Sequence, residues 1–507
     1  MKYSLSLSDL TVNLIPFTAR RVDSILIWCA PEISDRETLQ NNCSYLVDPD
    51  SSAHAKIFQA ERYGGSGLQR NGGGARCGFD GLNQIKGIGA NLLVGEGSDR
   101  HHSNGALDVN DAIYEALWGE VLADVLPYGA VRARAVLLTN SFIQNSRIPL
   151  RRALLVREPV IRPAHFERAP YFRPQFEYIG QLMHDARRVK AVIPMLPGCL
   201  PIPFEGFSVE AQCNPQLYCI EGLCELARRQ AWQMAFCRTR FLRLTTSPSN
   251  IATDGRLLDF NGLRCLFPGD YRDNFDHRLR VVQMMKEPWV LQQGLSDLCL
   301  YLGKYLFDSS FTLIARQHVE NTFRDTFQEA CYRGYLELLG IPTENLQLGR
   351  IPELLKQLVN SFITLLEKRS ETLYCPQRIE GEESQLQVLV MSLIHLSQRQ
   401  FIPDDSDIEH DVYFLEALRH FTDTIYWLAE IQGDDISRIM QGVEQRARKR
   451  LQPRDILGKV RMSDEISGIL DTYGNDALSL QQAFTEMGSR MQLFAREALG
   501  RQLYIPR

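Results

Sequence analysis

The chain has 507 residues, of which 44% are hydrophobic and 23% charged, as in globular proteins with room for about three domains. Its net charge of −5 argues against a nucleic-acid binder that works through its overall field. Twelve cysteines without a C-x-x-C pair, no signal-peptide pattern and no uninterrupted apolar span predict a cytoplasmic protein with free thiols and no membrane insertion.

Residues 1–165 have the pattern of an N-terminal segment followed by a small, β-rich lobe. Strands are predicted at 24–28, 82–85, 133–139 and 153–157, and a helix at 109–126. Asn110 or Asp111 is the expected cap of that helix, and Ile113, Leu117 and Val121 recur on one face. A glycine-rich stretch at 61–89 precedes it.

Residues 166–300 are predicted to form a larger helical lobe, with one long helix over 217–238, and 301–507 a helical C-terminal extension. In the extension an apolar stripe at helical spacing indicates a core-facing helix; its members are Leu354, Leu358, Phe362, Leu365 and Leu366. The order predicts an α+β chain with a protein-kinase-like two-lobed fold, ATP lying between the lobes, and a long helical C-terminal region.

The segment 249–260 predicts a metal site. Asp254-Gly255 is a strong signal for a two-residue hairpin turn, which would place Asn250 directly opposite Asp259. Opposed side chains lie about 4.5–5.5 Å apart at Cβ, so both could reach one Mg²⁺ that also binds nucleotide phosphates. The alternative is an ordinary hairpin closed by an Asn–Asp hydrogen bond.

Three further features are typical of a nucleotide site. Lys86 ends a predicted strand and can hold phosphates if Glu115, on the following helix, pairs with it. The turn at Gly72, Gly73 and Gly74 could bring backbone amides close to phosphate, although glycine clusters are often plain turns. Nine arginines occur between Arg132 and Arg173 against two carboxylates, which suits either a bound polyanion or a solvated basic face.

Several short motifs, in this order, resemble the selenoprotein O family of kinase-like proteins that transfer AMP. They are Glu61-Arg62-Tyr63-Gly64-Gly65, Gln84-Ile85-Lys86-Gly87-Ile88-Gly89, Asn104-Gly105-Ala106, Val156-Arg157, Ile161-Arg162-Pro163-Ala164-His165-Phe166-Glu167, and Asn250 nine residues before Asp259. The resemblance implies that Lys86 and Glu115 form the small-lobe ion pair and that Asn250 and Asp259 bind Mg²⁺. It also implies that Arg157 and Arg162 contact the phosphates of ATP.

The chain departs from that family at Ser249, where the family has an aspartate thought to act as base, and at Arg243, where it has a histidine. In length and texture it resembles more narrowly the MchC/MceJ family of siderophore–microcin maturation. That resemblance implies activation of a microcin C-terminal carboxylate, through an adenylate, for ester attachment to a glucosylated catecholate siderophore with an acyltransferase partner. The alternatives are a protein AMP transferase and a non-catalytic pseudokinase scaffold.

Overall fold

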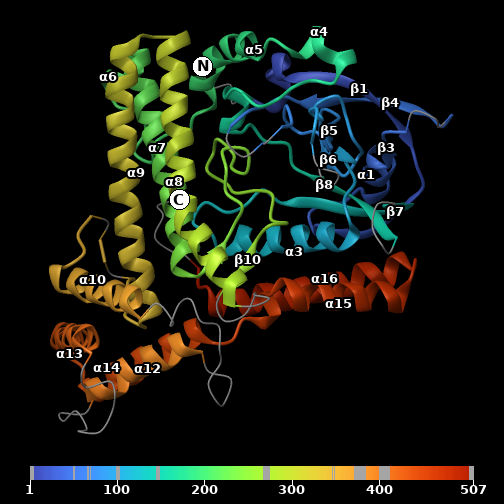
Figure 1. Cartoon of the computed structure of the whole chain (residues 1–507). Helices are drawn as coiled ribbons and strands as arrows, with labels where there is room; N and C mark the ends of the chain where they lie inside the picture. Colours follow the sequence, from blue (N-terminus) through green and yellow to red (C-terminus); the bar gives the residue numbers. More distant parts are fainter. Residues whose placement is uncertain are drawn as a thin grey trace.

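The computed structural model describes residues 5–48, 52–65, 68, 70–98, 103–143, 149–266, 274–344, 346–347, 349–369, 384–398 and 411–501. The chain is mixed α and β, with an antiparallel sheet in its first third and helices over most of the remainder (Figure 1). The α+β class and the long helical C-terminal region predicted from the sequence are therefore confirmed.

Eight strands form the main sheet, in the order β2-β7-β8-β6-β5-β4-β1-β3. Their bounds are β1 Leu14–Arg21, β2 Ser24–Cys29, β3 Tyr45–Leu46, β4 Ala55–Glu61, β5 Cys77–Phe79, β6 Gln84–Lys86, β7 Ala133–Ile143 and β8 Leu150–Arg157. The strands predicted at 24–28, 133–139 and 153–157 are confirmed as β2, β7 and β8, and the one predicted at 82–85 lies two residues later. Sequence analysis missed β1, β3, β4 and β5, because β1 contains Pro16 and half-exposed positions and β5 has only three residues.

Helix α3 (Val109–Val125) crosses one face of this sheet (Figure 1). Its cap is Asp108, whose carboxylate accepts a hydrogen bond from the Asn110 amide at 2.7 Å, so the prediction of Asn110 or Asp111 was wrong by two or three residues. Helices α15 (Lys459–Tyr473) and α16 (Ala477–Ala498) lie along its other side. Because α3 is covered from both sides, it is buried over most of its circumference.

The helical part is built around α7 (Pro215–Thr239), α8 (Asn274–Tyr305) and α9 (Ser309–Leu338), which stand side by side at the left of Figure 1. The helix predicted at 217–238 is confirmed as α7. The predicted boundary at 300/301 falls inside α8, and the one at 165/166 falls inside a short 3-10 helix, Pro163–Phe166. Helix α9 packs most closely against α7, so helices on either side of the predicted boundary pack together.

Eight further α-helices and a second, two-stranded sheet are described. They are the helices α1 Arg36–Cys43, α4 Ile179–Leu182, α5 Asp185–Val192, α6 Val209–Cys213, α10 Glu353–Lys368, α12 Gln385–Gln398, α13 Val412–Gln432 and α14 Ile436–Leu451, and the two-stranded pair β9 Leu242–Arg243 and β10 Arg264–Cys265. The apolar stripe predicted in 354–366 faces the core in α10, except that Leu354 is half-buried and Leu355 takes the buried position.

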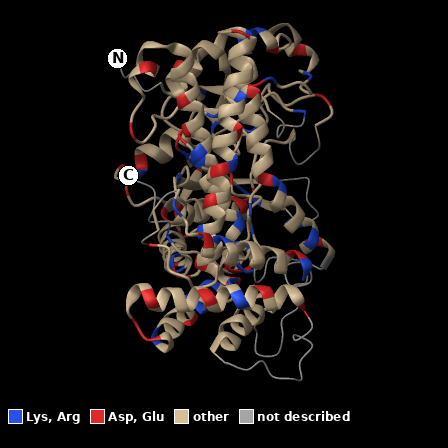
Figure 2. Cartoon of the chain, turned by 90° about the vertical axis from the view of Figure 1, so that its left-hand side faces the viewer, with Lys and Arg blue, Asp and Glu red and all other residues tan. Residues whose placement is uncertain are grey.

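Charges of both signs are interspersed along the helices that face the viewer in Figure 2. No helix within the described ranges combines the length and the apolar character needed to cross a membrane.

Candidate functional site

Lys86 is the centre of a buried charge cluster assembled from three distant parts of the chain. Its ammonium group lies 2.6 Å from Glu115 Oε2 on α3 and 2.7 Å from Asp259 Oδ1 in the loop after the 251–257 hairpin. The lysine side chain is only 1% exposed, whereas that of Asp259 is 27% exposed. The structure therefore brings together three of the predicted site residues and leaves one carboxylate open to a ligand.

The local fold explains why Lys86 points to this place. It is the last residue of β6, and its neighbours across the sheet are Cys77 and Leu155. The chain then turns at Gly87, which has φ of +93° and where a Cβ atom would lie 2.7 Å from the Ala153 carbonyl oxygen. Only glycine meets both conditions without strain, so the strand ends directly after the lysine.

Arg157, at the end of β8, joins the cluster through Glu115. Its Nη1 lies 3.1 Å from Glu115 Oε1, and its Nε donates a hydrogen bond to Gln84 Oε1. Burial alone would lower the pKa of Arg157, but the acidic groups around it, Cys77 first and then Glu115 and Asp259, raise the pKa above its ordinary value. Arg157 is therefore a permanently charged part of the site.

Arg162 shares the acceptor that binds Arg157. Its Nη2 donates to Gln84 Oε1 at 3.2 Å, while its Nη1 donates to the Ser249 carbonyl at 3.0 Å. Gln84 in turn donates through its Nε2 to Glu61 Oε1. A neutral amide thus orients two guanidinium groups without cancelling their charge, which keeps the region positive.

Glu61 supports this network from beneath. Burial would raise its pKa, but the hydrogen bond from His165 and the charge of Arg162 lower the pKa of Glu61 to about 2. The pKa of His165 is lowered, mainly by burial, so the ring is neutral at pH 7. Glu61 therefore carries a negative charge at neutral pH.

The predicted hairpin forms, but in a different register from the one expected. Ile251 pairs with Leu257, and the Ala252 amide donates to the Arg256 carbonyl at 2.8 Å, so the loop has three residues, not two. Gly255 adopts φ of +94°, as the last residue of such a loop does. The Asp254 carboxylate favours this turn by accepting from the amide and Nε of Arg256.

This shift changes the partner of Asn250. Its carbonyl accepts a hydrogen bond from the Leu258 amide at 3.0 Å, so Leu258 rather than Asp259 stands opposite, and the predicted direct pairing was wrong. In a regular strand a shift by one residue turns the side chain to the other face. Asp259 instead has φ of +67°, a left-handed conformation that breaks the alternation and directs its carboxylate to Lys86.

Asn250 has a fixed orientation beside this loop. Its Nδ2 donates to the Thr245 carbonyl at 2.6 Å, and its Oδ1 accepts from Ser249 Oγ at 3.3 Å. The Ser249 hydroxyl also contacts the Ser247 hydroxyl at 2.8 Å. Neither contact provides a carboxylate or imidazole that would take a proton from a hydroxyl group.

The turn at Gly72, Gly73 and Gly74 was expected to hold phosphate through its backbone amides, and the structure uses these amides differently. The amides of Gly72 and Gly74 already donate to the carbonyls of Leu93 and Glu61, both at 2.9 Å, and all three glycines are buried. A Cβ atom at Gly73 would lie 2.1 Å from the Glu61 carbonyl oxygen. The turn therefore packs the loop against β4, and these two amides are not available as phosphate donors.

Two residues that sequence analysis missed belong to the site. Gln84 lies two positions before Lys86 on the same strand, so the alternation of a strand would have placed it on the same face. Arg76 is the other residue. Burial would raise the pKa of Asp259, but the charges of Lys86, Arg157 and Arg76 together lower it well below its usual range. No spacing rule connects Arg76 to Asp259.

The arginine-rich segment resolves into two groups. Most of its members bind neighbouring parts of the fold, as Arg132 does through Glu120 and Glu32, and Arg152 through the Gly87 carbonyl. Only Arg157 and Arg162 converge on the charge cluster among the members within the described ranges, which exclude Arg147.

The charge cluster has a surplus of one positive charge, because four cationic side chains face three carboxylates. These are Lys86, Arg76, Arg157 and Arg162, and Glu61, Glu115 and Asp259. Within the described part of the chain, no group of three His, Cys, Asp or Glu residues gathers as a metal site. A divalent ion here would bind the exposed Asp259 carboxylate and the Asn250 amide oxygen, with its other positions left for phosphate and water, a donor set that suits Mg²⁺.

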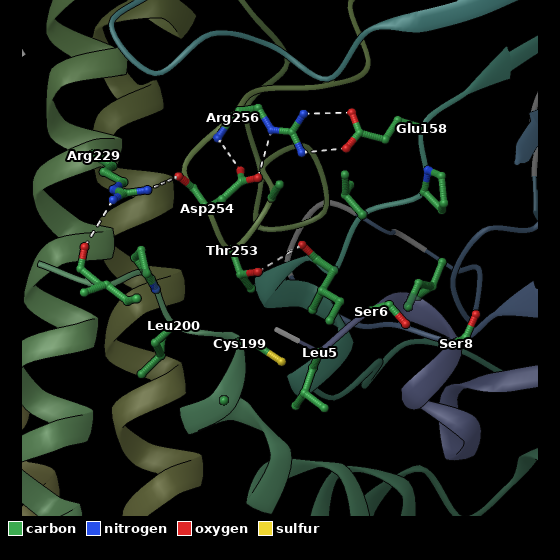
Figure 3. Close-up of a pocket in the computed structure, with 18 of the residues that line it drawn as sticks. Leu5, Ser6, Ser8, Glu158, Cys199, Leu200, Arg229, Thr253, Asp254 and Arg256 are labelled. Atoms are coloured by element: carbon green, nitrogen blue, oxygen red, sulfur yellow. Dashed lines mark hydrogen bonds and ion pairs between the residues drawn. The ribbon is translucent and has the colours of Figure 1, made fainter. Parts of the chain in front are cut away.

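A separate cavity of about 600 Å³ lies between the 158–161 segment, the hairpin tip, α7 and residues 5–8 (Figure 3). None of the residues of the Lys86 cluster lines it. Arg256 joins the hairpin to the 158–161 segment, with hydrogen bonds of 2.7 and 2.9 Å to Glu158 and 2.8 Å to Asp254 Oδ2. Arg256, Asp254 and Glu158, three charged side chains that line the cavity, are thus paired with one another.

No protein-family model matches the chain, and no curated protein is significantly similar to it.

Proposed function

We propose that this chain is an enzyme that binds Mg²⁺ and ATP in a kinase-like site and activates a carboxylate as its adenylate. The observation that carries the proposal is the contact of one buried lysine, Lys86, with both Glu115 and Asp259. Protein kinases use a strand lysine paired with a helix glutamate, and a downstream aspartate that binds the metal, to hold ATP phosphates. Burial of the Lys86 and Glu115 charges costs free energy, and a ligand that needs these charges would account for their retention.

The order of elements supports the same proposal. Lys86 ends β6, which pairs with β5 and β8, and α3, the helix that carries Glu115, begins further along the chain at Val109. In protein kinases the lysine likewise lies on a strand of the small lobe and the glutamate on a helix that follows it. Downstream, α7 leads into the loop that carries Asn250 and then Asp259.

The identity of the acceptor is inferred from what surrounds Ser249. A hydroxyl acceptor needs a base, and the Ser249 hydroxyl contacts only the Ser247 hydroxyl and the Asn250 amide among the described side chains. A carboxylate is already ionised at neutral pH and needs none. We therefore infer a carboxylate acceptor.

In the proposed reaction a carboxylate oxygen attacks the α-phosphorus of ATP. The bond from that phosphorus to the oxygen shared with the β-phosphorus breaks, pyrophosphate leaves with the electron pair, and no proton moves. Lys86, Arg157 and Arg162 would neutralise charge that develops on the phosphates. Mg²⁺, held by Asn250 and Asp259, would supply further charge neutralisation when bound.

We propose further that the carboxylate is the C-terminus of a microcin precursor in the cytoplasm. A sugar hydroxyl of a glucosylated siderophore then attacks the acyl carbon, AMP leaves, and the hydroxyl proton passes to a base of an acyltransferase partner. This finer proposal depends on the resemblance to the proteins of siderophore–microcin maturation.

The test is to incubate the protein and its partner with Mg²⁺, ATP and a peptide that has either a free or an amidated C-terminus. We expect AMP and pyrophosphate only with the free acid. Lys86→Met should lower their release by about 10²-fold or more, as the loss of a transition-state charge contact does. Lys56→Met is the matched control, because Lys56 forms a 2.9 Å ion pair with Asp80 in the same sheet, away from the cluster.

Other products would point to the alternatives. ADP and phosphate as the only products would end the adenylate proposal. Labelled AMP on Ser, Thr or Tyr side chains would favour a protein AMP transferase, and full activity of the assembly after Asp259→Ala would favour a non-catalytic scaffold.

A further inference from the structure

Lys459, the first residue of α15, connects two parts of the candidate site. Its ammonium group lies 2.8 Å from Asp111 Oδ1, in the first turn of α3, and 3.0 Å from the carbonyl oxygen of Asn261, two residues after Asp259. It also lies 4.8 Å from the ring centre of Tyr114. One side chain from the far end of the chain thus joins the helix that carries Glu115 to the loop that carries Asp259.

Two other contacts join the same helix and loop. The Tyr114 hydroxyl donates to the Leu263 carbonyl at 2.9 Å. Phe260 is buried and packs close to Gly119, where an added Cβ atom would lie 3.9 Å from Phe260 Cε2. Lys459 therefore adds to this group a polar link that comes from α15.

Helix α16 extends the contact along the rest of α3. Leu117 lies against Gly488, where a Cβ atom would approach Leu117 Cδ2 to 3.0 Å. At the far end of α3, Arg496 and Arg501 both bind the Asp124 carboxylate, the second at 2.8 Å. The C-terminal helix pair therefore holds α3 at its first turn, its middle and its last turn (Figure 1).

We propose that α15 and α16 are a built-in clamp that fixes α3 against the Asp259 loop, and that Lys459 is its positioning residue. In kinase-like sites the lysine–glutamate pair forms only when the glutamate helix is in place, and positioning of that helix is a usual point of control. Here the chain itself supplies the support that a separate activating subunit would otherwise give. The link to catalysis rests on the proposed function, whereas the clamp itself does not.

The strength expected of this link follows from its exposure. The Lys459 side chain is 20% exposed and that of Asp111 39% exposed, so the ion pair alone contributes little, and the hydrogen bond of the ammonium group to the Asn261 carbonyl adds to it. Loss of both contacts should loosen α3 and the loop by roughly three- to tenfold in their opening equilibrium.

The experiment compares Lys459→Met with Arg490→Met in the full-length protein. Arg490 forms an ion pair with Glu465 that joins α15 to α16 without touching α3, so its loss is a matched control. We expect amide hydrogen exchange in 109–117 and 259–264 to be three- to tenfold faster in Lys459→Met and unchanged in Arg490→Met. Lys459→Arg, which can still reach Asp111, should restore slow exchange.

Nucleotide measurements on the same variants separate the two proposals. Weaker binding of an ATP analogue in Lys459→Met, with normal binding in Arg490→Met, would tie the clamp to the site. If the unaltered protein binds no nucleotide, the proposed function fails while the exchange result still decides the clamp. Equal exchange rates in 109–117 and 259–264 for the two methionine variants would overturn the clamp. If Lys459→Met does not fold, Asp111→Asn takes its place in the comparison.

Discussion

The left-handed backbone at Asp259 gives a prediction about stability that does not depend on any ligand. Asp259→Gly and Asp259→Ala both remove the carboxylate that contacts Lys86, so that loss is the same in each. The two variants differ in the conformational free energy of a backbone φ of +67° at position 259, which glycine adopts freely and alanine does not. The glycine variant should therefore be the more stable of the two.

The size of the difference is the balance of two terms. A left-handed conformation costs alanine about 1–2 kcal/mol, whereas glycine loses about 0.4–1 kcal/mol more backbone entropy on folding. The net advantage of glycine is about 1 kcal/mol. With a denaturant dependence of about 3 kcal/mol per molar urea, the unfolding midpoint should differ by about 0.3 M.

The assay is urea unfolding followed by tryptophan fluorescence, since Trp118 is fully buried in α3. Asn261 is the control position, because it lies in the same loop and its φ is not positive. There alanine should be more stable than glycine by about 0.4–1 kcal/mol, so the order of the two variants reverses between the positions. An alanine variant at 259 that equals or exceeds the glycine variant would refute the left-handed conformation and the redirected carboxylate.

Two further predictions concern buried polar groups. Burial and the nearby charge of Asp297 raise the pKa of Glu167 to about 8, well above that of an unfolded glutamate, so its stabilising contribution is complete below about pH 4.5 and is lost as the pH rises through 8. Glu167→Gln should remove about 3–5 kcal/mol of that pH dependence. The measurement is the difference in urea midpoint between the unaltered protein and the variant, and a difference that is the same at pH 6 and at pH 9 would contradict the prediction. Gln84→Glu should weaken binding of an ATP analogue, because the added negative charge cancels the positive surplus around Arg157 and Arg162. Gln84→Leu should lower the free energy of unfolding, measured with urea, by about 1–3 kcal/mol, because it leaves the buried donors of both arginines without an acceptor.

Local patterns were sufficient for the parts of the fold that depend on neighbouring residues. Apolar residues at helical spacing located α3 and α10, and short apolar runs located β7 and β8, because the core-facing side chains of these elements leave a pattern in the sequence. The pairing of Lys86 with Glu115 was predicted from the same order of strand and helix.

Patterns were not sufficient where two local preferences compete. The Asp254-Gly255 pair marked the turn, but the hydrogen bonds of the Asp254 carboxylate to Arg256 favour the three-residue loop, and the register moved by one. The metal-binding prediction for Asn250 and Asp259 then depends on the left-handed turn at Asp259, which no spacing rule indicates.

The sequence by itself determined which residues carry charge, where the chain turns and which faces are apolar. Only the tertiary structure decided which charges meet: Arg76 with Asp259, Gln84 with two arginines, and Lys459 with Asp111 across 348 positions of the chain. The physical reason is that such contacts arise when whole elements pack together, and their free energy is shared among many apolar contacts that no short segment records.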